Sequence, residues 1–218
     1  MADDTARTGT EAGLQRPFDE VLGLGGYSVK LRREPISDDV LATCLRAAGS
    51  GMANPQRCEL IVLRDPDRLH QMARIYRQGW GVYRRLVEFR GGRTDAHQWE
   101  ADHFEDVPAV VVGCARGIRP LFPAVGSARY YAAVLPPMQN LLLAGRALGL
   151  AASFTTLPVW SGWQARRTLD LPFTVTPVAV AVLGWPAEPL KPASRRPLAS
   201  FSALDHHGEP FPEPPAGD

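Results

Sequence analysis

Lysine is scarce in this chain. Of the 24 basic residues among 218, only Lys30 and Lys191 are lysines, and arginine supplies the rest. Because alanine, glycine and proline are abundant as well, we interpret the arginine excess as GC-rich codon usage rather than as a sign of RNA binding. The formal net charge is only +1, so no overall field would attract nucleic acid or an anionic membrane. The two lysines are therefore examined individually.

Cysteine is also scarce, and its pattern excludes a disulfide framework. Cys44, Cys58 and Cys114 lie in apolar contexts, and no two have the spacing of a metal-binding pair. An odd, sparse set is typical of a reducing compartment. The first ten residues lack the apolar core of a signal peptide, and no apolar run is long enough to span a bilayer. We therefore expect a cytoplasmic protein without a membrane partner.

The chain lacks the short motifs of several enzyme classes. No Gly-x-Gly-x-x-Gly follows a strand pattern, which leaves a Rossmann nicotinamide domain unsupported, and there is neither a P-loop nor a Gly-x-Ser-x-Gly elbow. His97, His103, His206 and His207 have no cysteine or carboxylate arranged around them, so surface histidines are favoured over a metal site. If the chain is an enzyme, its chemistry should belong to a bound cofactor.

The chain contains helix and strand patterns that are mixed without regular βαβ alternation. This favours a single α+β domain over residues 16–207. The polar segments 1–15 and 208–218 are expected to be disordered tails, because they have too little apolar content to offset ordering entropy. Helices are predicted over residues 18–24, 38–48, 66–87, 128–148 and 161–169, and strands over 59–63, 108–115, 151–156 and 177–183.

Two stretches have distinctive polarity. Residues 128–148 are apolar almost all round, apart from the interruption at Pro136-Pro137, which indicates a helix in the interior or at a subunit interface. Gln139 and Asn140 within it are expected to be satisfied polar groups rather than catalysts. Residues 91–105 are polar and aperiodic, and we expect an exposed excursion there.

The segment Ser50–Gln56, between a predicted helix and strand, is the first candidate for ligand binding. Its small residues would let a planar ligand approach the main chain closely. Asn54 and Gln56 offer uncharged donors and acceptors that suit a heteroaromatic edge. The alternative is an ordinary turn, since Gly, Asn and Pro also favour turns.

Three further segments could contribute. Residues 26–30 bring a hydroxyl and a lone ammonium, and Arg195-Arg196-Pro197-Leu198 brings two guanidiniums suited to bidentate phosphate binding. The alternative for both is a solvated surface cation. Small residues in Gly149–Thr156 would let backbone amides meet a planar ring, although a helix C-cap leading into a strand explains them equally.

Taken in order along the chain, these segments resemble the motifs of the nitroreductase family of flavin-dependent oxidoreductases. Ser28 and Lys30 fit the last two places of the family's Arg-x-Ser-x-Arg/Lys pattern, and Ser50–Gln56 is similar to its Pro-Ser-x-x-Asn-x-Gln loop. The resemblance continues through a Leu-Gly-Ile-Pro-like step, a Leu-Gly-Tyr-Pro-like strand end and a closing basic motif, which are Leu169–Pro172, Leu183–Pro186 and Arg195–Leu198. It covers roughly residues 19–205.

The resemblance implies a three-layer α+β sandwich, with a central, mostly antiparallel sheet flanked by helices, in an intertwined homodimer. It implies FMN as the cofactor, NAD(P)H as co-substrate, and a small-molecule acceptor such as a nitroaromatic or a quinone, reduced in ping-pong order. No catalytic side chain is expected, because N5 of the flavin carries the hydride. The cofactor-binding residues implied are Ser28, Lys30, Gly51, Met52, Asn54, Gln56, Ser153, Phe154, Thr155, Arg195 and Arg196.

Within this set, Asn54 and Gln56 would reach the flavin bound by the partner subunit. One departure concerns the phosphate: Gly26 stands where the family has its first arginine. Losing a charge-assisted hydrogen bond worth about 1.5–3 kcal/mol would weaken FMN binding by one to two decades. Two alternatives stay open: a flavin-dependent oxidase or dehydrogenase of a biosynthetic pathway, and a flavin-binding dimer without turnover.

Overall fold

The computed structural model describes residues 16–25, 30–91, 95–117 and 131–212, with the backbone alone for residues 95–97. The predicted N-terminal tail, Gly26 and Ser28 lie outside the described residues, as do residues 213–218. The division into one domain and two tails stays a prediction. No helix in the described part of the chain combines the length and the apolarity that a bilayer crossing requires.

A four-stranded antiparallel sheet forms the middle layer. Its strands are β1 (Cys58–Leu63), β2 (Ala109–Arg116), β3 (Ala151–Thr155) and β4 (Val175–Gly184), in the order β1-β2-β4-β3. The central strands β2 and β4 are buried at nearly every position, which explains why their sequences are continuous apolar runs. The edge strands β1 and β3 are only partly buried.

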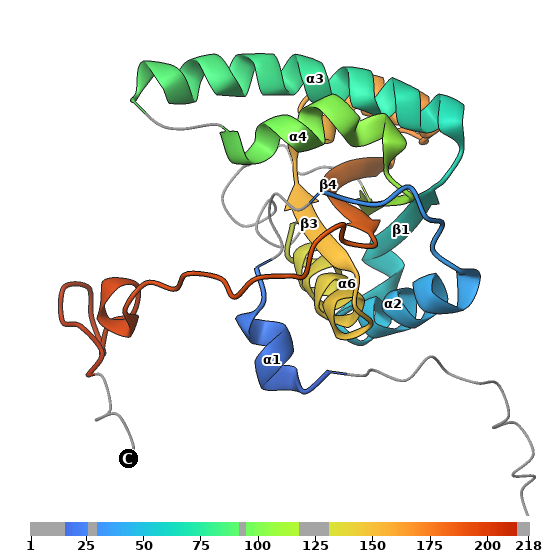
Figure 1. Ribbon diagram of the computed structural model, residues 1–218. Helices are drawn as coiled ribbons and strands as arrows, with labels where there is room; N and C mark the ends of the chain where they lie inside the picture. Colours follow the sequence, from blue (N-terminus) through green and yellow to red (C-terminus); the bar gives the residue numbers. More distant parts are fainter. Residues whose placement is uncertain (1–15, 26–29, 92–94, 118–130, 213–218) are drawn as a thin grey trace, which may run out of the picture.

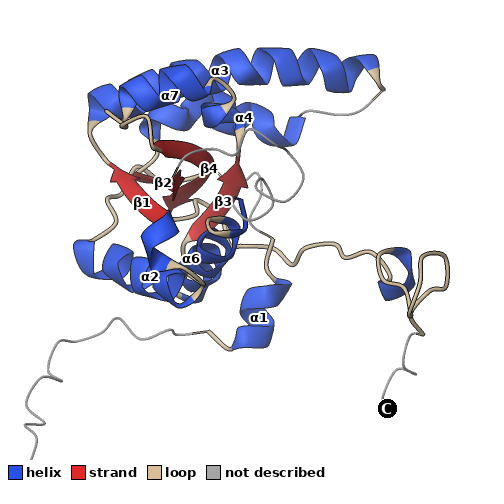
Figure 2. Cartoon of the chain, turned by 180° about the vertical axis from the view of Figure 1, so that it is seen from behind, coloured by secondary structure: helices blue, strands red, loops and turns tan. Residues whose placement is uncertain are grey.

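Helices cover both faces of this sheet, and so complete three layers (Figures 1 and 2). One face carries α2 (Asp38–Ser50) and α6 (Leu135–Ala147), and the short α1 (Phe18–Gly23) packs against α6. The other face carries α3 (Pro66–Phe89), α4 (Asp95–His103) and α7 (Gly162–Thr168). The predicted three-layer α+β sandwich is therefore confirmed.

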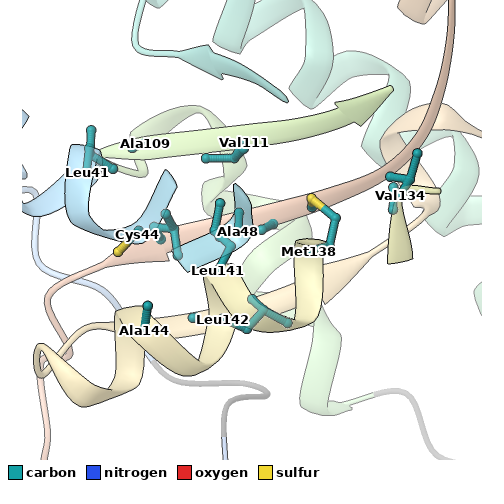
Figure 3. Packing of buried hydrophobic residues seen from close by; sticks show 14 of the residues in the cluster. Leu41, Cys44, Ala48, Ala109, Val111, Val134, Met138, Leu141, Leu142 and Ala144 are labelled. Atoms are coloured by element: carbon teal, nitrogen blue, oxygen red, sulfur yellow. The ribbon is translucent and has the colours of Figure 1, made fainter. Parts of the chain in front are cut away.

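The two cores follow from the two-residue period of the strands. On β2, Ala109 and Val111 face α2 and α6, whereas Val110 and Val112 face α3. Figure 3 shows the first core, where side chains of α2 and α6 meet over the strands. At Gly113 of β2, a Cβ atom would lie 2.6 Å from Val134 Cγ1 and 2.9 Å from Met138 Sδ, so any larger residue would force these side chains to shift.

Several predicted helix ends are confirmed by their caps. Ser37 accepts a hydrogen bond from the Val40 amide at the start of α2, and Asp65 accepts one from the Arg68 amide at the start of α3. Pro66 occupies the first turn of α3, where its missing N–H is harmless. The α3 helix runs through Gly79 to Phe89, as its periodicity predicts.

The prediction of a helix over residues 128–148 was wrong at its start. Within the described part, Tyr131 and Ala132 are helical, a turn follows, and α6 begins at Leu135. Pro136 and Pro137 lie in the first turn of α6, where a proline disrupts no hydrogen bond. The two prolines therefore start the helix instead of interrupting it.

The expectation of an exposed excursion over residues 91–105 was also wrong. The segment contains α4, and Glu100, Ala101 and Phe104 are buried. Phe104 stacks on Tyr76 of α3 with ring centroids 5.0 Å apart. The few large apolar residues here are too sparse to produce a visible helical period, yet they suffice to dock the segment on α3.

The chain beyond β4 leaves the three layers. Figure 1 shows residues 194–212, which we call the C-terminal arm, extending away from the sheet. The arm contains a short 3-10 turn (Leu198–Ser200) and an isolated bridge between Ala203 and Pro210. Its apolar side chains Phe201 and Phe211 are exposed.

Candidate functional site

Two segments from the ends of the chain pair beside the sheet. Residues 22–25 and 30–32 lie antiparallel to parts of residues 185–195, with isolated bridges at Leu24–Pro192 and Leu31–Pro186. Backbone amides of Gly25, Arg32 and Ala187 each donate a hydrogen bond across this pairing. The terminal pairing, as we call it, brings both cationic motifs of the sequence into one structure.

The cationic side chains of the terminal pairing differ in the partners that they contact. Lys30 is exposed and forms no ion pair with any described residue, while its backbone oxygen accepts the Ala187 amide at 2.8 Å. The Arg195 guanidinium donates to the backbone oxygen of Leu22 in the last turn of α1, where a cation also suits the helix dipole. Arg196 lies over the Phe201 ring at 5.8 Å from its centroid, and no carboxylate in the described chain pairs with it. Lys30 and Arg196 are thus available to an anion, and Arg195 has in part a structural task.

The predicted loop residues divide into structural and exposed positions. Gly51 is required by helix packing, since a Cβ atom there would lie 2.9 Å from Asn140 Nδ2 and 3.0 Å from the Pro136 backbone. Met52 is half-buried against the core of α2 and α6. The Asn54 side chain accepts a hydrogen bond from the Gln56 amide at 3.2 Å, so its carbonyl shapes the loop itself. The Gln56 side chain is exposed.

Asn140 explains how α2 ends at this loop. Its Nδ2 donates to the Ala47 backbone oxygen at 3.3 Å and to Ser50 Oγ at 3.2 Å. These groups belong to the last turn of α2, where backbone carbonyls have no partner within the helix. The prediction that Asn140 is a polar group with hydrogen-bond partners is confirmed. A groove of about 240 Å³ between α1, α2 and α6 opens beside Ser50 and Asn140.

The three candidate residues of β3 point to both helical layers. Phe154 packs toward the α2–α6 core, whereas Ser153 and Thr155 face α3 and α4. All three side chains therefore face helices of the same chain. Because β3 pairs only with β4 in the described sheet, its outer edge presents backbone N–H and C=O groups. A ligand beside β3 would meet this backbone edge rather than the three side chains.

The structure brings some predicted site residues together and separates others. Cys58, which follows the Asn54–Gln56 loop, pairs with Ala115 at one end of the sheet. Lys30 adjoins the opposite end, where β4 finishes and the chain enters the terminal pairing. The six residues of β1 alone span about 20 Å. Within one chain, the loop and Lys30 therefore cannot contact the same ring.

Comparisons with known proteins identify this architecture. No family model and no curated protein sequence matches the chain. Solved structures do match it. Nitroreductase A from Vibrio parahaemolyticus is 15% identical with a TM-score of 0.66, and the match covers 88% of this chain and 77% of that one. The NADPH:FMN oxidoreductase from Vibrio harveyi, complexed with NAD⁺, is 16% identical with a TM-score of 0.67 over 88% and 78% of the two chains.

A third structure has a different activity. Iodotyrosine deiodinase, bound to FMN and 3-iodo-L-tyrosine, is 14% identical with a TM-score of 0.65, and the match covers 86% of this chain and all of that one, 100%. The chain has the nitroreductase fold. The resemblance found in the sequence therefore predicted the fold correctly. At such low identity the nitroreductase fold does not by itself transfer an activity or the role of a single residue.

Sequence reasoning missed one polar cluster within this nitroreductase fold. Glu100 of α4 is only 6% exposed, and its carboxyl lies near the Ser153 side chain of β3. Tyr76 of α3 is also buried, and its hydroxyl lies near the Thr155 side chain. Burial raises the pKa of Glu100 from its ordinary 4.5 to about 7, against the smaller opposing effect of the nearby Ser153 hydroxyl. Burial likewise raises the pKa of Tyr76, and the nearby Glu100 adds to that increase.

The sequence offered little to reveal this cluster. Glu100 lies in a polar stretch, where an acidic residue is usually solvated. Only the two-residue period of β3, which sends Ser153 and Thr155 to one face, was visible beforehand. That period could not show that an acidic residue of α4 would meet the same face.

Proposed function

We propose that this chain is an FMN-dependent oxidoreductase that uses NAD(P)H to reduce a nitroaromatic, a quinone or a related electrophile, and that it works as a homodimer. Solved structures with the same fold support the proposal, because they include a NADPH:FMN oxidoreductase and a deiodinase bound to FMN. The observation that carries it is the separation of the candidate residues to opposite ends of one sheet. A cytoplasmic location fits the supply of NAD(P)H.

A two-fold dimer would complete the site that one chain leaves divided. In an isologous interface, each chain gives the same group of residues to its partner, so two equivalent sites form. The Asn54–Gln56 loop of one subunit would then lie against the Lys30 end of the other. The C-terminal arm supports the same arrangement. It extends from the three layers (Figure 1). Its exposed Phe201 and Phe211 are side chains that a second copy would cover.

The cations of the terminal pairing fit FMN chemically. Lys30 and Arg195 lie toward opposite ends of this pairing, so they suit the two ends of an elongated ligand rather than one anionic group. We assign Lys30 to the N1–C2 edge of the ring, and Arg196 with Arg195 to the phosphate. Ser28 remains a predicted phosphate ligand from outside the described residues. Guanidinium groups bind phosphate strongly through paired, charge-assisted hydrogen bonds.

The remaining residues would orient the ring and exclude water. The free backbone edge of β3 at Ser153–Thr155 would line one side of the ring, and the partner's loop the other, with Met52 packing nearby. A positive charge from Lys30 at the ring edge would stabilise the negative charge that develops on reduction. FMN, when bound, supplies the hydride-accepting N5 atom, so no side chain need act as acid or base.

One experiment tests this function directly. The purified protein is incubated with FMN, freed of unbound flavin, and its absorbance is recorded before and after anaerobic addition of NADPH or NADH. We expect a bound flavin spectrum that bleaches with at least one nicotinamide and returns when a quinone or nitroaromatic is added. A bound flavin that no nicotinamide bleaches would favour the oxidase or dehydrogenase alternative. A colourless, monomeric protein in excess FMN would contradict the proposal.

A further inference from the structure

A second groove lies between α3 and α7, on the face of the sheet that α2 and α6 do not cover. This α3–α7 groove has a volume of about 240 Å³, and its lining residues are Gln71, Arg74, Ile75, Gln78, Trp163, Gln164, Arg167 and Thr168. Figure 2 shows α7 beside α3 above the sheet, whereas α1 and α2 lie below it. No lining residue belongs to the predicted FMN set. The groove is therefore a candidate site for a ligand other than the proposed flavin.

The floor of the α3–α7 groove is a fixed part of the fold. Ile75 and Thr168 are buried. The Ile75 backbone oxygen accepts a hydrogen bond from Trp160 Nε1 at 3.0 Å, and the Thr168 backbone oxygen accepts one from Arg68 Nη1 at 2.6 Å. These bonds join α3 to the chain just before α7 and to the last residue of α7. The walls of the groove are thus held in place before any ligand binds, which lowers the entropic cost of binding.

The lining of the α3–α7 groove is basic and contains no carboxylate. Arg74 of α3 and Arg167 of α7 are exposed, and neither forms an ion pair with a described residue. Other arginines of α3 differ in this respect: carboxylates pair with Arg68, Arg77 and Arg84 at 2.6, 3.5 and 3.7 Å. Two unpaired guanidinium groups on adjacent helices suit a phosphate, which they bind through paired, charge-assisted hydrogen bonds.

An exposed aromatic ring lies beside these two arginines. Trp163 is 65% exposed, although tryptophan is highly buried on average. The Arg167 guanidinium lies over the Trp163 ring, 5.0 Å from its centroid. A planar base that stacks on this indole would remove apolar surface from water, and it would leave a phosphate of the same ligand within reach of Arg167.

Three glutamines supply the remaining polar groups of the lining. Gln71 and Gln78 are exposed, whereas Gln164 is partly buried, and no described residue donates a hydrogen bond to its buried Oε1 atom. A buried acceptor without a donor is unfavourable. Rotation about the last torsion of Gln164, which has a broad minimum, would present this oxygen to a donor in the groove. Side-chain amides pair well with adenine, whose N6 amino group is such a donor.

We propose that the α3–α7 groove binds an adenine nucleotide. The base stacks on Trp163, its amino group donates to Gln164, and the phosphate lies between Arg74 and Arg167. No chemical step takes place there, so the nucleotide is a bound ligand and not a substrate of this site. The inference goes beyond the proposed function and does not depend on it, because the groove shares no residue with the candidate flavin site.

Isothermal titration calorimetry of the full chain with AMP tests this site. We expect a dissociation constant below about 1 mM, as for a small ligand in an open groove. Arg74→Ala, Arg167→Ala and Trp163→Ala should each weaken AMP binding about tenfold, because each removes a charged hydrogen bond or the stacking surface. All three side chains are exposed, so circular dichroism should be unaltered. Arg85→Ala, an exposed arginine of α3 outside the groove, and Lys30→Ala should bind AMP like the wild type.

Analogues of AMP test each part of the ligand. Adenosine lacks the phosphate and inorganic phosphate lacks the base, so each should bind at least about tenfold more weakly than AMP. IMP has an oxygen in place of the amino group and should also bind about tenfold more weakly, and Gln164→Leu should abolish this preference. Inorganic phosphate that binds as tightly as AMP would show a plain anion site and overturn the proposal. Equal affinities of the wild type for AMP and IMP would contradict the assignment of Gln164 and of adenine.

A spectroscopic measurement on the wild type locates the nucleotide without relying on the variants' stability. The chain has five tryptophans, and in a proton–nitrogen correlation spectrum Trp163→Phe identifies the indole signal of Trp163. AMP should shift that signal in the wild type with the same dissociation constant as the calorimetry. Absence of AMP binding in the millimolar range, an unshifted Trp163 signal, or binding that Lys30→Ala abolishes and the three groove variants leave unchanged would overturn the proposal. The last result would place AMP at the candidate flavin site instead.

Discussion

At the scale of single residues, the structure separates cations that the sequence could not distinguish. Arg195 is engaged with α1, whereas Lys30 and Arg196 form no ion pair within the described chain. The sequence predicted all three as FMN ligands from their motifs alone. It could not show that the Arg195 guanidinium donates to the Leu22 carbonyl, because that hydrogen bond joins residues 173 positions apart.

We expect Lys30→Ala to raise the FMN dissociation constant about tenfold or more, because it removes a charged hydrogen bond worth about 1.5–3 kcal/mol. Titration of the flavin fluorescence measures this change, and far-ultraviolet circular dichroism should be unaltered. Arg85→Ala, an exposed cation of α3, is the matched control and should bind like the wild type. Equal affinities of all three proteins would remove Lys30 from the site.

Glu100 predicts how stability depends on pH, whatever the protein binds. The folded chain holds this proton more tightly than the unfolded chain, since the pKa is about 7 rather than 4.5. The stabilisation is therefore complete below about pH 4.5 and is lost as the pH rises to about 7. Urea unfolding should show that the wild type loses up to about 3 kcal/mol relative to Glu100→Gln between these values. A constant difference between the two proteins would contradict the burial of an ionisable Glu100.

At the scale of elements, periodicity predicted most of the fold and failed where context decides. The central strands β2 and β4 have apolar runs that can only be buried, and all four strands were placed within a few residues. The start of α6 was missed because prolines can either break or begin a helix, and only the turn before Leu135 settles which. The α4 helix was missed because its burial depends on tertiary contacts with Tyr76 and Trp80.

The Ser50–Gln56 loop was predicted as a site because its residues are small, and packing now explains one of them. Gly51→Ala would push a methyl group against Asn140 and the Pro136 backbone, so it should destabilise the protein by about 1–3 kcal/mol. Gly49→Ala, two residues earlier, meets no atom within 4 Å and should be neutral or stabilising by up to about 1 kcal/mol. Thermal or urea unfolding compares them. If Gly51→Ala proved as stable as Gly49→Ala, the close contact of α2 and α6 would be refuted.

At the scale of the whole molecule, the candidate residues of one chain are too far apart to form one site together. The candidate residues lie at opposite ends of a single sheet, and the C-terminal arm extends away from both cores. The sequence alone could not reveal this separation, because motif order along the chain says nothing about which copy of the chain completes a site. The resemblance to nitroreductases supplied that expectation, and the described topology is consistent with it.

Removing residues 198–218 tests the role of the arm. Since the arm makes few contacts with the two cores, the truncated chain should keep its secondary structure while dissociating toward monomers and losing FMN affinity. Sedimentation velocity over a range of protein concentrations measures the first effect, and flavin titration the second. A truncated protein that remains dimeric and binds FMN normally would show that the arm is dispensable.

Mixed dimers test the central claim, a flavin site built from two chains, most directly. Lys30→Ala and Gln56→Ala each damage both sites of their own homodimer, but in a mixed dimer both substitutions fall on one site and leave the other intact. FMN titration before and after subunit exchange should therefore reveal one tight site per mixed dimer that neither parent possesses. If the mixture binds no more tightly than the parents, although mass spectrometry confirms that mixed dimers have formed, the two residues do not act across an interface and the account is contradicted.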